Sequence, residues 1–219
     1  PSSYAQPGPF DVSTSRYMVE PFDAILSHGV RQVDIRKAIQ TAGTLVAEVS
    51  ILYFLANAPG PIMWTQQSDA DAKEHFKGRF NALMKRCAPV AALIPKHDRH
   101  AMSTTEVWFG DFFLIGNGAN LNNLQSKSIR YKINSEVWLW KQGLMSDAKG
   151  RVSAFERVGT SKILNESQGS FEGDDAGREW SEGTQEHWSV KCESCGEHAP
   201  LEFFGRAKDA PEKRVGVVW

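Results

Sequence analysis

The chain has 219 residues, of which 41% are hydrophobic and 23% charged, and its formal net charge is -1. A chain of this length can bury one substantial core and a small additional element, and the near-neutral charge excludes the basic surplus of many nucleic-acid-binding proteins. The longest apolar stretch, residues 45–58, is interrupted by Glu48 and Asn57 and is too short to span a bilayer. We therefore expect no membrane segment, and the lack of a secretory signal pattern predicts a cytoplasmic protein.

The first half of the chain predicts two successive strand–helix units after a Pro-, Ser- and Gly-rich N-terminal arm. Hydrophobic patterning and stop signals predict helices and strands at these places: a helix over 22–28, a strand over 32–38, a mostly buried helix over 44–57, a strand over 62–65, and a helix from 68 or 69 to about 86. Pro59-Gly60-Pro61 ends the second of these helices.

The second half adds a hairpin and further strands. Residues 106–109 and 112–115 flank Gly110-Asp111, which is a hairpin signal, and residues 129–133 and 160–164 predict two more strands. Strands that alternate with helices favour a mostly parallel α/β sheet covered on both faces. Beyond residue 169 the chain becomes polar and Gly-rich. The predicted division is an arm at 1–20, an α/β domain at 21–170, and a linker with a small β-rich extension at 171–219.

The segment from Val33 to Thr44 has the layout of a strand that leads into a phosphate-binding loop and a helix. Such a loop binds phosphate through backbone N–H groups and the helix N-terminus, and it usually ends in Gly-Lys before Ser or Thr. Here Ala42 and Gly43 occupy the Gly-Lys positions, while Thr44 keeps the hydroxyl. Without its flanking sequence, the segment could equally be a plain strand-to-helix turn.

Cys192 and Cys195 have two residues between them, and Cys87 stands alone. In a reducing compartment the close pair favours metal over a disulfide, and thiolates on a tight turn fit half of a tetrahedral zinc site. His187 and His198 could complete such a site. Two ordinary reduced thiols are the alternative.

Taken in order, several segments resemble the ATPase domain of the large terminase subunit of tailed phages, the lambda-like GpA family. The matching segments are Pro21-Phe22, Lys37 with residues 40–44, residues 59–62, Gly118-Ala119-Asn120, residues 124–130, Glu136, Thr160-Ser161 and residues 188–197. The resemblance covers the chain from residue 21 to 219. It implies a P-loop NTPase fold of the ASCE type over residues 21–170, followed by a linker and a partial zinc-ribbon-like extension.

The resemblance also implies a site for ATP and Mg²⁺ between the loop and the acidic strand end. Glu136 would be the catalytic glutamate and Thr160 the residue that couples hydrolysis to movement. The nucleotide contacts that the resemblance implies are Asp23, Arg36, Lys37, Gln40, Thr41, Ala42, Gly43, Thr44 and Ser135. Thr44 and Ser135 are also the candidate Mg²⁺ ligands, and Cys192 and Cys195 the candidate Zn²⁺ ligands. By itself Glu136 could be a solvated acid at a strand end.

Three positions depart from the family's pattern. The loop lacks its Gly-Lys pair, although Lys37 or Arg36 could supply the positive charge. Ser135 replaces the aspartate of the family's Asp-Glu pair, and Asp23 replaces a glutamine that would contact adenine. Because losing electrostatic stabilisers commonly costs orders of magnitude in rate, the altered motifs could weaken or abolish hydrolysis.

The function that the resemblance implies is packaging of double-stranded viral DNA, powered by ATP, in the host bacterial cytoplasm at the procapsid portal. The expected partners are the DNA, the terminase small subunit, the portal protein and further copies of the chain in a ring. The family's nuclease would lie beyond this segment. Basic residues at 73, 77, 79, 85 and 86 could meet DNA phosphates or form a solvated face. Two alternatives remain: a catalytically silent terminase-like scaffold, and an unrelated zinc-knuckle binding module.

Overall fold

The computed structural model describes residue 8 and residues 11–95, 101–125, 127–169, 171, 173–200, 205–207 and 210–215. The chain divides into two compact units, Pro1–Gly183 and Thr184–Trp219, which we describe separately. No helix in the described part of the chain is both long enough and apolar enough to cross a membrane.

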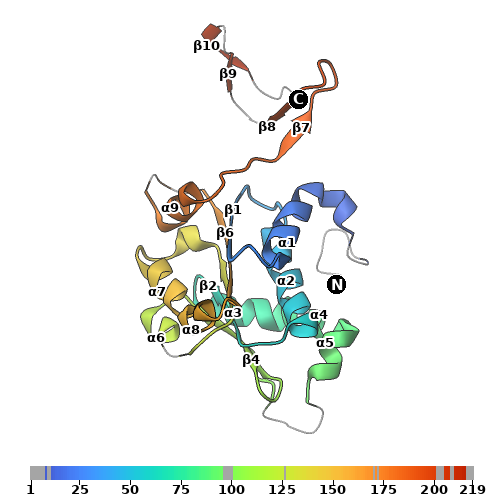
Figure 1. The fold of residues 1–219 in the computed structure, drawn as a ribbon, viewed down its shortest axis with the longest axis vertical. Coiled ribbons are helices and arrows are strands. Elements are labelled where there is room, and N and C mark those ends of the chain that lie inside the picture. Colours follow the sequence, from blue (N-terminus) through green and yellow to red (C-terminus); the bar gives the residue numbers. More distant parts are fainter. Residues whose placement is uncertain are drawn as a thin grey trace. The chain divides into compact units, whose positions relative to one another are not determined.

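A six-stranded, mostly parallel sheet forms the centre of the first unit (Figure 1). Its strands are β1 (Gln32–Lys37), β2 (Ile62–Gln66), β3 (Glu106–Trp108), β4 (Phe113–Gly118), β5 (Tyr131–Ser135) and β6 (Lys162–Gln168), in the spatial order β1-β6-β5-β2-β4-β3. Only β3 pairs antiparallel, with β4, as the predicted hairpin requires. The predicted strand at 160–164 begins two residues and ends four residues too early. Strand β6 continues through the polar residues Asn165 to Gln168.

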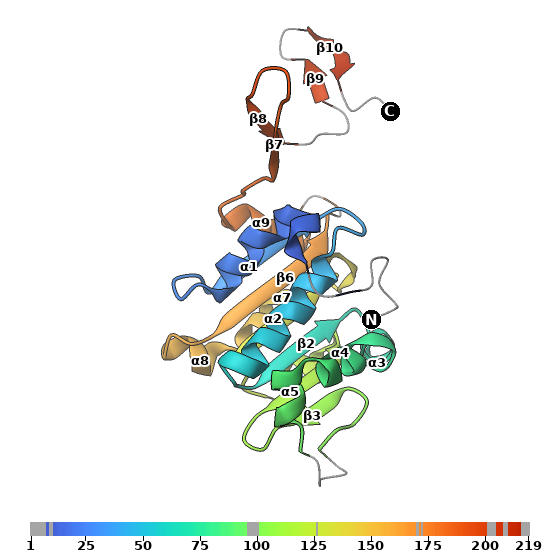
Figure 2. The same ribbon diagram turned by 90° about the vertical axis from the view of Figure 1, so that its right-hand side faces the viewer.

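Helices cover both faces of this sheet (Figures 1 and 2). One face carries α1 (Val19–Leu26), α2 (Gly43–Asn57), α3 (Asp69–His75), α4 (Asn81–Arg86) and α5 (Ala88–Leu93). The other carries α6 (Leu121–Leu124), the short 3-10 helix Val137–Leu139, α7 (Leu144–Gly150), α8 (Ser153–Arg157) and α9 (Asp175–Glu182). Each face buries its own apolar cluster, with Ile51 and Leu164 in the first and Met63 and Met145 in the second. The predicted α/β layering is therefore confirmed.

The predicted helix from 68 to 86 is interrupted by a π-helical turn, Phe76–Phe80, between α3 and α4. Its start is as expected, because the Ser68 side chain accepts a hydrogen bond from the Asp71 N–H. The π turn places Phe76 and Phe80 against the buried Trp64 ring. Irregular turns of this kind shift the helix register, so local packing against β2 outweighs ideal helix geometry here.

The segments predicted as an N-terminal arm (1–20) and as a linker with a β-rich extension (171–219) both contain helices. Residues Val12–Met18 form a 3-10 helix that ends on the buried Met18. Helix α9, within the segment predicted as linker, packs against β1 in the first unit. The second unit contains the antiparallel pairs β7 (Ser189–Lys191) with β8 (His198–Pro200) and β9 (Gly205–Ala207) with β10 (Ala210–Val215).

A fully buried lysine, Lys132 on β5, gives a prediction about stability and pH. Its Nζ donates to Thr65 Oγ1 at 2.5 Å and to Asn134 Oδ1 at 2.6 Å, and burial holds its pKa well below the usual value. The unfolded chain therefore binds this proton more tightly than the folded one, so stability should rise with pH between the lowered pKa of the folded chain and about 10.4.

We expect the wild type to gain up to about 1.4 kcal/mol of unfolding free energy per pH unit from this one group within that pH range. Lys132→Met keeps the side-chain length but removes the proton, so it should flatten this part of the profile. Urea unfolding of both proteins at several pH values measures the difference. Parallel pH profiles would show that Lys132 titrates normally.

Candidate functional site

Three parallel strands, β1, β6 and β5, end at the same edge of the sheet and bring the candidate residues together. Their register aligns Lys37 with Gln168 and Ser135 with Glu166. The loop of residues 38–42 leaves this edge after β1 and leads into α2. The predicted proximity of the loop and the acidic strand end is thus found in the structure.

The loop takes a tightly turned conformation although it lacks the usual glycines. Gln40 and Ala42 have φ angles of 58° and 62°, which non-glycine residues rarely adopt. Thr41 Oγ1 donates to the Ala38 carbonyl at 2.8 Å and fixes the turn. Ala42 is the N-cap of α2 and has no side chain that can accept a hydrogen bond. No side chain therefore caps the start of this 15-residue helix, and uncapped N–H groups at a helix N-terminus can bind an anion.

Lys37 brings a positive charge to the start of α2. Its Nζ lies 2.9 Å from Glu136 Oε1 and 3.2 Å from Glu166 Oε2, and its side chain is only 8% exposed. Burial opposes the charged form, but the two carboxylates outweigh it and raise the pKa of Lys37. The ammonium is therefore charged at neutral pH.

Gly43 makes room for this lysine. A Cβ at position 43 would lie 2.2 Å from Lys37 Cδ and 2.8 Å from Glu166 Oε2. Both distances are shorter than real Cβ contacts allow, so any side chain at 43 competes with Lys37 for the same space. The two departures from the usual loop are physically linked, because the lysine comes from the end of β1 and the glycine accommodates it.

Glu136 ends β5 in a left-handed backbone conformation, with φ of 51°. Its Oε1 accepts from Lys37, and its Oε2 accepts from Trp138 Nε1 at 2.8 Å and from Gln168 Nε2 at 3.4 Å. The carboxylate is thus held from three sides while its side chain stays 26% exposed. Strained backbone of this kind persists where the surroundings fix it and is frequent at functional sites.

A second carboxylate, Glu166 on β6, is not among the residues predicted from the sequence. It is completely buried, and it lies next to Ser135 in the strand register. Burial raises the pKa of its carboxyl, and the Lys37 ammonium lowers it in part. A glutamate two residues after the apolar pair Ile163-Leu164 was the available signal, because a charge inside a buried strand needs a partner.

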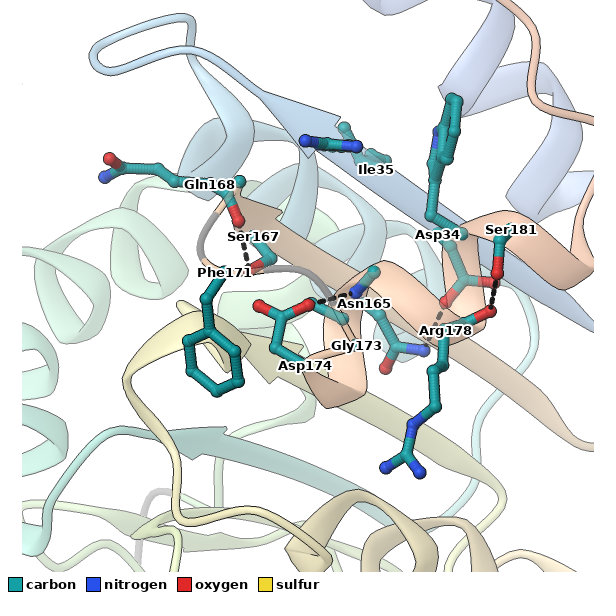
Figure 3. Close-up of a pocket in the computed structure, with 15 residues that line it drawn as sticks. Asp34, Ile35, Asn165, Ser167, Gln168, Phe171, Gly173, Asp174, Arg178 and Ser181 are labelled. Carbon is teal, nitrogen blue, oxygen red and sulfur yellow. Dashed lines mark hydrogen bonds between the residues drawn. The ribbon is translucent and has the colours of Figure 1, made fainter.

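Arg36, the other candidate for the loop's positive charge, points away from the loop. Its guanidinium lies 5.5 Å from the centre of the Trp180 ring, and both residues line a pocket of 440 Å³. Asp34 of β1, Asn165 of β6 and Arg178 of α9 line the same pocket (Figure 3). Successive side chains of a strand face opposite sides of the sheet, so Lys37 and Arg36 cannot both reach the loop. The prediction for Arg36 is not supported by this geometry.

Comparison with known protein families shows which family this chain belongs to. The family model described as phage terminase large subunit gpA, ATPase domain, matches residues 4–215. The chain belongs to this family. The resemblance seen in the sequence is confirmed, and an ATPase domain implies a bound nucleotide.

Two solved structures of the large terminase ATPase domain from Thermus phage P74-26 are similar in fold. The first has a TM-score of 0.50 and 17% identity, and the match covers 78% of this chain and 71% of that chain. The second, a mutant, has a TM-score of 0.56 and 15% identity, and the match covers 88% of this chain and 78% of that chain. A search of curated proteins found no match. At these identities the structures support the fold class, which is confirmed as α/β of the terminase ATPase type.

Thr160, expected to couple hydrolysis to movement in this terminase domain, lies at the edge of the sheet opposite to the loop. It precedes β6, its hydroxyl donates to the Phe155 carbonyl, and its own carbonyl accepts from Arg130 Nε. The length of β6 separates it from the loop, which is about 20 Å at 3.3 Å per residue. Ser167 and Gln168 occupy the carboxyl end of β6 instead, so Thr160 is not brought to the site.

Two other predicted contacts have only partial support. The Ser135 hydroxyl is buried and accepts a hydrogen bond from Trp64 Nε1 at 2.8 Å, so it is already engaged. Asp23 is exposed on α1, and its contact with adenine stays a prediction.

Zinc has no support in the terminase chain. Cys192 and Cys195 are exposed free cysteines on the turn between β7 and β8. Among the described residues there is no group of three or more His, Cys, Asp or Glu side chains that could hold a metal ion. A pair of thiolates alone does not complete a tetrahedral zinc site.

Proposed function

We propose that this chain binds ATP at the carboxyl edge of β1, β6 and β5 and hydrolyses it to drive packaging of double-stranded phage DNA. The observation that carries the proposal is the meeting of Lys37 and Glu136 at 2.9 Å beside the uncapped start of α2. An anion site, a positive charge and a positioned carboxylate are the parts that phosphoryl transfer to water requires.

Each part has a role that follows from its position. The N–H groups at the start of α2 and the Lys37 ammonium bind the phosphates and neutralise their charge. When the triphosphate takes over Lys37, the Glu136 Oε1 loses its present partner and becomes free to orient a water molecule and accept its proton. Trp138 and Gln168 keep the carboxylate in place during this exchange.

Mg²⁺, when bound with the nucleotide, would neutralise charge on the β- and γ-phosphates. The chain offers the Thr44 hydroxyl at the second position of α2 and the carboxylates beside Lys37. These oxygens fit Mg²⁺, which is usually bound by one or two carboxylates together with substrate phosphates.

Family membership further supports the partners expected for a packaging motor: duplex DNA, the terminase small subunit, the portal protein and other copies of the chain in a ring. The proposed setting is the host bacterial cytoplasm at the procapsid portal. Exposed lysines and an arginine on α3, the π turn and α4, namely Lys73, Lys77, Lys85 and Arg86, offer a basic face for DNA phosphates. Arg79 belongs less to this face, because it pairs with the buried Glu48 at 2.7 Å.

The test is ATP turnover, measured with and without DNA, in the wild type and in Glu136→Gln. Because a positioned general base contributes at least about 100-fold, we expect a loss of about that size in kcat. Glu156→Gln, an exposed glutamate on α8, is the control and should leave turnover unchanged. Equal rates in the wild type and Glu136→Gln would favour the silent terminase-like scaffold.

A further inference from the structure

The site has a buried carboxylate whose contacts only partly compensate its burial. Both side-chain oxygens of Glu166 are buried, and neither accepts a hydrogen bond of good geometry within the described part of the chain. Lys37 Nζ lies 3.2 Å from Glu166 Oε2, and contacts with Lys37 and with the Ser135 hydroxyl lower the pKa of this carboxyl, but burial raises it more. A buried carboxylate in this state is costly unless a cation compensates it.

The position of Glu166 relates it to the serine at the end of β5. Ser135 and Glu166 are direct neighbours across the β5–β6 pair. Ser135 has no charge, and Trp64 already donates to its hydroxyl. Strand β5 therefore has no carboxylate at position 135, next to Glu136. The neighbouring strand β6 has one, Glu166, directly beside Ser135.

Glu166 also faces the place where phosphates would bind. Its Oε2 lies 2.8 Å from the point that a Cβ on Gly43 would occupy, at the first turn of α2. Thr44, the next residue of that turn, carries the hydroxyl suited to Mg²⁺. The Glu166 carboxylate thus lies beside the first turn of α2, the turn to which Thr44 belongs.

Charge favours a further cation in this region. Lys37 already lies between the carboxylates of Glu136 and Glu166, so the structure contains one cation held by both. The three charges sum to -1, and a nucleotide adds more negative charge. A divalent ion bound with a nucleotide needs only one or two protein carboxylates, because phosphates and water supply the other ligands.

We propose that Glu166 binds the divalent cation that accompanies the nucleotide, and so replaces the carboxylate that position 135 lacks. This inference rests on the proposed ATP site. The competing explanation is that Glu166 serves only as an ion-pair partner of Lys37. The two differ in one respect: loss of a metal ligand reduces the gain in nucleotide affinity that the metal gives, whereas loss of an ion-pair partner changes the affinity equally with and without metal.

The test uses a fluorescent, non-hydrolysable ATP analogue, whose binding is measured by anisotropy with EDTA and with increasing Mn²⁺ or Mg²⁺. For the wild type we expect the metal to tighten binding at least about tenfold. Glu166→Gln should lose this gain, and any change in its metal-free affinity reports the loss of its ion pair with Lys37. The double variant Ser135→Asp/Glu166→Gln should regain the metal-dependent gain, because it returns a carboxylate to the adjacent strand. Glu156→Gln is the matched control and should behave as the wild type.

Two further measurements distinguish a loss of metal binding from a loss of folding. Thermal unfolding of each variant checks that it folds, and the electron paramagnetic resonance signal of Mn²⁺ reports metal binding in the ternary complex without any turnover. If Glu166→Gln keeps the metal-dependent gain, or the double variant fails to regain it, Glu166 is only the ion-pair partner. If the wild type binds nucleotide with no gain from metal, the inference fails and the ATP site stands. If the wild type binds no nucleotide in either condition, the proposed function fails and the inference with it.

Discussion

Lys37→Ala is expected to lower kcat/KM for ATP about 1,000-fold, whereas Arg36→Ala should change it less than about threefold. The two residues are adjacent in sequence and carry the same charge, but they point to opposite faces of β1. Lys37 lies between two carboxylates at the start of α2, and Arg36 lies against Trp180 under α9. Removing Lys37 would leave both carboxylates beside the phosphates without a cation, which adds repulsion to the lost attraction.

The measurement is steady-state ATP hydrolysis together with equilibrium nucleotide binding for both variants. Lys37→Met is a second variant that keeps the buried stem of the side chain, so it separates the loss of charge from the loss of packing. Circular dichroism and thermal unfolding establish that each protein is folded. Equal losses for Arg36→Ala and Lys37→Ala, or no loss for either, would contradict this assignment of the phosphate-binding lysine.

The sequence was sufficient to locate the loop and its acidic counterpart. The patterns around Lys37 and Glu136 are local, each lies at the end of a strand, and parallel strands end at a common edge. The apolar stretch before Asn57 likewise predicted α2 closely, since the helix runs Gly43–Asn57. Features of this kind depend on a few neighbouring residues, so they can be recognised without knowledge of the fold.

Glu166 could not be found in the same way, because its role depends on which strands are neighbours. Only the pairing of β5 with β6 puts it beside Ser135, although the two residues are 31 positions apart in sequence. The polar end of β6, from Asn165 to Gln168, also breaks the apolar pattern that signals a strand. The same break explains why the predicted strand began and ended too early. Thr160 came from the family resemblance, and its coupling role stays a prediction.

The second large effect is expected from a substitution at Gly43, the position where phosphate-binding loops usually have lysine. Gly43→Lys restores the residue type that phosphate-binding loops usually have at this position, yet we expect it to lower kcat/KM for ATP at least about 100-fold. Its Cβ would meet Lys37 Cδ at 2.2 Å, so the new side chain must displace Lys37 or distort the first turn of α2. Two ammonium groups in one buried site also repel each other.

The double variant Lys37→Ala/Gly43→Lys removes the clash and keeps one ammonium in the site. We expect it to recover at least about tenfold of kcat/KM over Gly43→Lys, because positions 37 and 43 supply the same group from two directions. Gly43→Ala tests the steric part alone, since it adds a Cβ without a charge. The double-mutant cycle compares ATP hydrolysis and nucleotide binding of the wild type, Lys37→Ala, Gly43→Lys and the double variant. Additive effects would mean that the two residues do not share one space, and the direct link between the altered loop and its lysine would then be lost.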